Sequence, residues 1–141
     1  MKKKRIKYKK TKFNFIQHWG TYNIETLVSV GTNYNEVLDC IKRLKFKKEN
    51  IQAIKEDKEV PSFIERKPAC FLGMPSGNIL HFKGFKDEWY FYEWLIHELF
   101  HAVYIELGKN SSMIKEEEAM AYQIEFLFRE IRRKLQNHYK R

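Results

Sequence analysis

The sequence lacks a run of about 18 consecutive apolar residues, the length that a transmembrane helix needs, so we expect no membrane contact. Its basic N-terminus, MKKKRIKYKKTK, is not followed by an apolar core or a small-residue cleavage site, which argues against a secretory signal. Cysteine is scarce: Cys40 and Cys70 are the only two, and neither belongs to a CxxC pair. This excludes a disulfide framework. Together these absences predict a cytoplasmic protein with two reduced, partly buried thiols.

Apolar residues are nevertheless plentiful. They make up 43% of the 141 residues, and 16% are aromatic, so the chain can form a core without disulfide bonds. We expect a single domain over residues 12–141, preceded by a flexible basic arm at residues 1–11.

Positive charge exceeds negative charge by nine, and much of the excess lies in the basic arm and in the C-terminal REIRRKLQNHYKR. Such tails can contact nucleic acid or another acidic partner. A solvated surface is the more common reason for charge of this kind, and no zinc-finger or RNA-binding signature accompanies it. Nucleic-acid contact is therefore a secondary hypothesis.

The first half of the chain has the patterns of strands and then of helices. Alternating apolar and polar residues predict a hairpin of two strands, over residues 12–19 and 22–31. Asn33 or Asn35 can cap a helix through NEVLDCIKRLKF, which has an apolar stripe. The polar residues 47–68 favour a short helix followed by a surface connection.

The second half begins with two apolar runs around MPSGN, which predict another hairpin over residues 69–85. A helix is expected from about Asp87 to Leu107, with Gly108 as its C-terminal cap residue. Ser111 or Ser112 can cap a last helix that runs to about residue 137. This order of strands and helices predicts an α+β fold.

The helix expected after Asp87 contains HELFH at residues 97–101. Residues four apart lie on one face of a helix, so His97 and His101 can direct their imidazoles at one metal ion. Zinc binds imidazole nitrogen well, and a catalytic zinc has three protein ligands and a water. Glu98 would then lie close enough to that water to act as a general base. Without a metal, the two histidines would need other hydrogen-bond partners in this apolar segment.

A glutamate from the following helix, packed antiparallel, would complete a His-His-Glu site. Three candidates adjoin one another: Glu116, Glu117 and Glu118. On a helical wheel, Glu117 falls near the apolar stripe, Glu116 at its edge and Glu118 away from it. Periodicity alone therefore favours Glu117. Because a ligand near a helix start can face a cleft instead of the core, the choice stays open.

HELFH followed by a glutamate-bearing helix resembles the gluzincin branch of zinc metallopeptidases, particularly the small gluzincin-like proteins of phages and mobile elements. In these the second motif is commonly Glu-x-x-Ala, and EAMAY at residues 118–122 agrees with it, so the resemblance implies that Glu118 is the ligand. The related ImmA/IrrE-type peptidases have Glu-x-Glu-Ala, and an alignment on EEEA would choose Glu116. The tyrosine after Ala121 favours Glu118. The resemblance covers about residues 68–131.

The resemblance implies a zincin-like fold, with a small antiparallel or mixed sheet beside the HExxH helix and the glutamate-bearing helix after it. It implies Zn²⁺ bound by His97, His101 and Glu118, and hydrolysis of a peptide or protein substrate with Glu98 as the base. An edge strand, at residues 69–72 or 77–85, would bind an extended peptide by β-augmentation. For the residue that stabilises the oxyanion in larger gluzincins, the only candidates are Tyr104 and Tyr122.

Two other interpretations stay open. One is a non-catalytic, zinc-stabilised module that binds a partner or nucleic acid through the basic tails, which the lack of a clear oxyanion residue favours. The other is a pair of helices without metal. The intact Glu98 favours the enzyme, because a structural zinc site needs no general base. The sequence indicates neither the substrate nor the oligomeric state.

Overall fold

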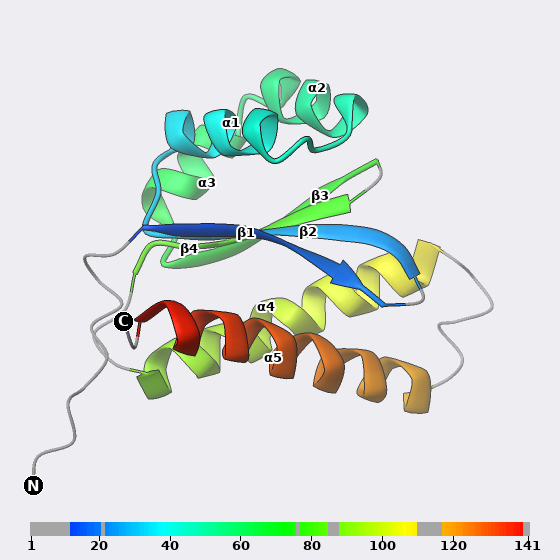
Figure 1. The fold of residues 1–141 in the computed structure, drawn as a ribbon. Helices are drawn as coiled ribbons and strands as arrows, with labels where there is room; N and C mark the ends of the chain where they lie inside the picture. The colour runs from blue at the N-terminus through cyan, green and yellow to red at the C-terminus, as the bar shows by residue number, and fades with distance from the viewer. Residues whose placement is uncertain (1–11, 21, 76, 85–87, 110–116, 140–141) are drawn as a thin grey trace, which may run out of the picture.

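The computed structural model describes residues 12–20, 22–75, 77–84, 88–109 and 117–139. These residues form four strands and five helices, which confirms the α+β class (Figure 1). In chain order the elements are β1 (Phe13–Trp19), β2 (Tyr22–Val30), α1 (Tyr34–Arg43), α2 (Lys48–Glu56), α3 (Val60–Arg66), β3 (Ala69–Met74), β4 (Gly77–Phe82), α4 (Glu88–Lys109) and α5 (Glu117–Tyr139).

The four strands form one mixed sheet in the order β1-β2-β4-β3. The hairpins β1–β2 and β3–β4 are antiparallel, as the sequence predicts, and they join through a parallel pairing of β2 with β4. Gly77 begins that pairing opposite Glu25. A Cβ atom at Gly77 would lie 2.7 Å from the backbone oxygen of Glu25, so the close approach of the two strands requires glycine.

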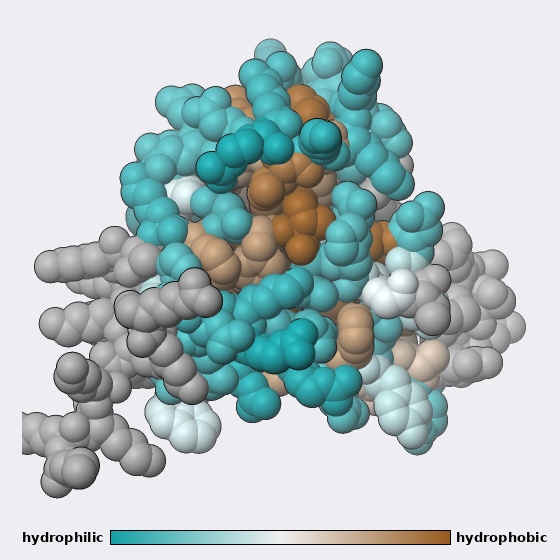
Figure 2. Space-filling model, viewed as in Figure 1, coloured by the Kyte–Doolittle hydropathy of each residue, from teal (hydrophilic) through white to brown (hydrophobic). Residues whose placement is uncertain are grey.

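Helices cover both faces of the sheet. In Figure 1, α1, α2 and α3 lie above it, and the two long helices α4 and α5 lie below it, antiparallel to each other. Neighbouring residues of β4 point to opposite faces: Ile79 packs in the cluster of α1–α3, and Leu80 packs in the cluster of α4 and α5. Figure 2 shows mostly hydrophilic side chains over the outer surfaces of α1, α2 and α5, with hydrophobic ones visible between the layers.

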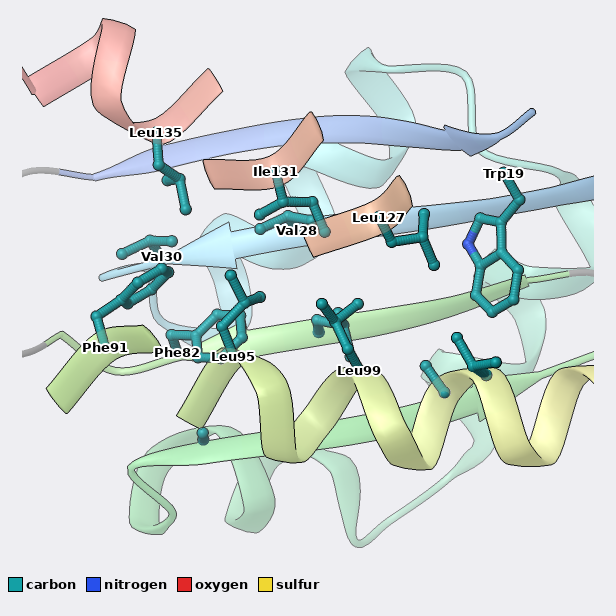
Figure 3. Packing of buried hydrophobic residues seen from close by; sticks show 14 of the residues in the cluster. Trp19, Val28, Val30, Phe82, Phe91, Leu95, Leu99, Leu127, Ile131 and Leu135 are labelled. Atoms are coloured by element: carbon teal, nitrogen blue, oxygen red, sulfur yellow. The ribbon is translucent and has the colours of Figure 1, made fainter. Parts of the chain in front are cut away.

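The layer of α4 and α5 is held to the sheet by an apolar cluster. Figure 3 shows side chains from both helices that point toward the strands. The helices contribute Phe91, Leu95, Leu99, Leu127, Ile131 and Leu135 to this cluster. The sheet contributes Trp19, Val28, Val30 and Phe82. No described helix is both long and apolar enough to cross a lipid bilayer.

Helix α1 begins at one of the two predicted cap residues. Asn33, and not Asn35, is the cap: its side-chain oxygen accepts a hydrogen bond from the Glu36 backbone N–H at 2.9 Å. The Glu36 carboxylate in turn accepts from the Asn33 backbone N–H at 3.2 Å. This reciprocal pair is a capping box, which satisfies two backbone donors at the start of the helix.

Two predicted boundaries are wrong. The second half of residues 47–68 is helix α3, and not a surface connection; Pro61 lies in its first turn, where proline is tolerated, and Val60 and Ile64 are buried. Gly108 does not end α4, which continues through it to Lys109. The predicted caps at Asp87, Ser111 and Ser112, and the basic arm at residues 1–11, lie outside the described residues.

Candidate active site

Helix α4 brings the two histidines of HELFH together, as their spacing predicts. The Nε2 atoms of His97 and His101 lie 3.2 Å apart, on the exposed side of the helix. Two nitrogen ligands on a tetrahedral zinc, with Zn–N bonds of about 2.0–2.1 Å, are separated by about 3.3 Å. The separation of the two nitrogen atoms is therefore close to that of two ligands on one zinc ion. The same distance also allows a hydrogen bond between the two rings.

The pair lies at a groove of about 430 Å³ between α3, β3 and α4. Apolar side chains form most of its wall, and Trp94 has its ring centre 5.7 Å from that of His97. Strand β3 is at the edge of the sheet, so residues 69–72 are the one of the two predicted segments that lies at a sheet edge. Ala69, Cys70 and Phe71 of this strand line the groove. Residues 77–82 form the interior strand β4.

Glu98 also lines the groove, and only 5% of its surface is exposed. Burial raises the pKa of Glu98 above its ordinary value, while His97, His101 and then Lys67 act in the opposite direction. No hydrogen bond to its carboxylate comes from any residue in the described ranges. A buried carboxylate without a fixed donor, beside two imidazoles, is suited to accept and return a proton.

A chain of buried hydrogen bonds fixes the rotation of α4 against the sheet. Trp19 Nε1 donates to Thr26 Oγ1 at 2.7 Å, and Thr26 Oγ1 donates to Asn78 Oδ1 at 2.6 Å. Asn78 Nδ2 then donates to the Glu106 carboxylate at 3.1 Å. Since Glu106 lies on the same helix as HELFH, this chain helps to keep the motif turned toward the groove.

The groove contains two polar residues, Lys67 and Cys70, that were not predicted to lie there. Lys67 follows α3, and its Nζ lies 4.5 Å from the centre of the Phe63 ring. Cys70 is a buried free thiol, as predicted for both cysteines. Burial, and then the charge of Glu98, raises the pKa of Cys70 to about 12, so this thiol is neutral. No spacing along the sequence signals either residue, because only the placement of β3 brings them opposite α4.

Of the three glutamates proposed as the third ligand, the two that the structure describes do not line the groove. Glu117 and Glu118 are exposed in the first turn of α5, and Glu116 lies outside the described residues. Helix α5 packs on α4 through Leu95 and Leu99, and none of its described residues lines the groove. Within the described ranges, no three His, Cys, Asp or Glu side chains could hold one metal ion. The Glu118 ligand therefore stays a prediction.

The other polar candidates lie elsewhere. Tyr104 and Tyr122 are 51% and 67% exposed, and neither lines the groove. Glu125 lies 3.9 Å from Arg129 on the exposed side of α5 and does not line the groove. The ring of His138 stacks on that of Phe13 with a ring-centre distance of 3.9 Å.

The chain matches no family model, no curated protein and no solved structure. What it has is a pair of imidazoles at zinc spacing, a buried carboxylate beside them and an edge strand along the same groove. These are parts that a zinc peptidase needs to hold the metal, to move a proton and to bind an extended substrate.

Proposed function

We propose that the protein is a zincin-like, zinc-dependent peptidase whose active site is the groove beside β3. The observation that supports this most is the 3.2 Å separation of the His97 and His101 Nε2 atoms next to the buried Glu98. Bound zinc would supply a water of lowered pKa and polarise the scissile carbonyl. Glu98 would accept the proton of the attacking water and return it to the leaving amine.

The substrate would be a peptide, or an extended segment of a protein, that adds to the edge of the sheet. Among the described strands, β3 pairs only with β4, so a further strand could add to its outer edge. Phe71 and Trp94 line the same groove and would contact substrate side chains. The groove thus favours apolar residues near the cleaved bond.

The third zinc ligand in this proposal is Glu118, with Glu116 and Glu117 as alternatives. The Glu118 side chain is exposed at the start of α5. Coordination by it therefore requires a different arrangement of that first turn.

Zinc analysis tests the metal site. We expect stoichiometric zinc in the purified wild-type protein and its loss in His97→Ala and His101→Ala. His18→Ala is the control, because that side chain is exposed on β1. Among Glu116→Gln, Glu117→Gln and Glu118→Gln, only the ligand variant should lose zinc affinity, by about 10- to 100-fold or more. A wild-type protein that binds no zinc would contradict the proposal and favour a metal-free helix pair.

The catalytic step is tested with Glu98→Gln, which keeps the shape of the side chain and removes the base. We expect cleavage of a random peptide library by the wild type, and a decrease of at least about 100-fold in the variant, with zinc retained. Undiminished cleavage by Glu98→Gln would show that another group is the base.

A second function is favoured by the position of Tyr104 and Tyr122 outside the groove, which leaves no tyrosine to stabilise an oxyanion among its described lining residues. In that case the zinc site only stabilises the fold, and the basic tails bind nucleic acid or another acidic partner. Stoichiometric zinc without cleavage, together with salt-dependent nucleic-acid binding that is lost when residues 1–11 are deleted, would support it.

A further inference from the structure

Helix α4 is apolar on the side that faces solvent as well as on the side that faces the sheet. Trp89, Ile96, Phe100 and Tyr104 are 81%, 50%, 52% and 51% exposed, respectively. Their spacings of seven, four and four residues align them along one side of the helix. We call these four residues the outer stripe. A helix at the surface of a soluble protein normally has charged and polar residues in such positions.

The outer stripe has the chemistry of the centre of a protein interface. The sequence contains no Lys or Arg from residue 89 to residue 104, although the whole chain has 27 of them. Phe100 and Tyr104 stack with their ring centres 6.0 Å apart and their planes inclined by 18°. Aromatic enrichment and lysine depletion distinguish interface cores from the rest of a protein surface.

The exposed area of the outer stripe is close to the apolar area that one subunit buries in a homodimer interface. If each of these side chains offers roughly 200 Å², their exposed fractions amount to about 470 Å² of mostly apolar surface. A standard interface buries about 800 Å² per partner, and roughly 65% of a homodimer interface is apolar, which is about 520 Å². The stripe alone therefore provides the apolar part of a homodimer interface.

We propose that a second copy of this chain covers the outer stripe, with α4 packed antiparallel against its counterpart across a two-fold axis near Ile96. A straight, apolar stripe is complementary to itself under such an axis, because each copy meets the same chemistry that it presents. Glu93 is the only charged residue at matching helical spacing along the stripe, so the stripe offers little that an acidic or basic partner would recognise. Glu98 faces the groove on another side of α4, so the dimer does not depend on the proposed peptidase activity.

The oligomeric state of the full chain tests this. Sedimentation velocity at micromolar concentrations should show a dimer for the wild type and a monomer for Phe100→Glu. Tyr122→Glu is the matched control: it places the same charge at an exposed aromatic position on α5, outside the stripe, and should leave the dimer intact. All three proteins should have the same circular dichroism spectrum. A monomeric wild type, including one that binds apolar peptides or anionic vesicles instead, would overturn the proposal, as would a dimeric Phe100→Glu.

The antiparallel geometry is tested by disulfide cross-linking. Ile96→Cys lies at the proposed axis and should cross-link to its own copy under mild oxidation. Trp89→Cys should not, since seven residues on each side of the axis separate the two copies by about 20 Å. Cys40 and Cys70 are buried, which keeps background cross-linking low. Cross-linking of both variants, or of Trp89→Cys alone, would exclude this arrangement.

Discussion

The two faces of the sheet are covered by helices of different length and different chemistry. On one face, the short helices α1–α3 enclose an apolar cluster, and the outer surfaces of α1 and α2 are mostly hydrophilic (Figure 2). On the other face, α4 buries the Glu98 carboxylate and exposes the outer stripe to solvent. Burying a carboxylate and exposing large apolar side chains both reduce stability. Under the two proposals made above, the first face serves stability and the second gives up some stability for binding and chemistry.

The largest effect on stability is expected from substitutions at two neighbouring residues of β4. Both residues are fully buried, and they face opposite sides of the sheet. Ile79→Ala and Leu80→Ala should each lower the free energy of unfolding by about 3 kcal/mol, measured by chemical denaturation. Only Leu80→Ala removes packing beneath α4, so only this variant should also weaken zinc binding. Equal zinc affinity in the two variants would mean that the faces are not functionally distinct.

A second prediction concerns His81, which is fully buried with its Nδ1 3.1 Å from Ser29 Oγ. Burial lowers the pKa of His81 to about 4, with a smaller contribution from Lys83 and partial compensation by the Ile64 backbone. Between pH 6.5 and pH 4 the unfolded chain takes up a proton at this residue that the folded protein does not. Stability should therefore fall as the pH decreases through this window, by about 3 kcal/mol in total from this residue.

Denaturation of the wild type and of His81→Gln at several pH values isolates this effect from the carboxylates. The variant should lose less stability than the wild type between pH 6.5 and pH 4. His18→Gln, at an exposed position, should behave like the wild type. Parallel curves for the wild type and His81→Gln would contradict the assignment.

The smallest effect is expected at Lys67, the only lysine or arginine among the described residues that line the groove. If the groove hydrolyses peptides, a cation there would stabilise negative charge that develops on the carbonyl oxygen. Lys67→Met should lower kcat about tenfold, less than for a buried donor because Lys67 is exposed to solvent. KM and zinc content should change little. Lys55→Met, on the outside of α2, should have no effect.

Local patterns predicted much of this fold. Alternation located the strands, Asn33 was one of two predicted caps, and the spacing of His97 and His101 was sufficient to place both rings on one side of a helix. Helix α3 was missed because it has only seven residues and no side-chain cap. Its helical form depends on the burial of Val60 and Ile64, which is a tertiary effect.

The groove was less predictable than the motif. The HELFH motif was sufficient to identify His97, His101 and Glu98 as candidates. The groove, however, also depends on the position of β3 at the sheet edge, which brings Lys67 and Cys70 opposite α4. That placement follows from the pairing of β4 with β2, which are distant in sequence, and strand pairing of this kind leaves no local pattern. For the same reason, periodicity on α5 could not decide among Glu116, Glu117 and Glu118 as the proposed third ligand.

The parallel pairing of β2 with β4 has a consequence for the order in which the molecule folds. Each hairpin joins neighbouring segments and can form quickly. The two hairpins, however, are separated along the chain by the whole segment that forms α1, α2 and α3. Pairing over such a separation forms late, because the chain loses the entropy of a long loop before the contact stabilises it. During synthesis on the ribosome, the edge of β2 that pairs with β4 therefore has no partner strand until Gly77–Phe82 has emerged.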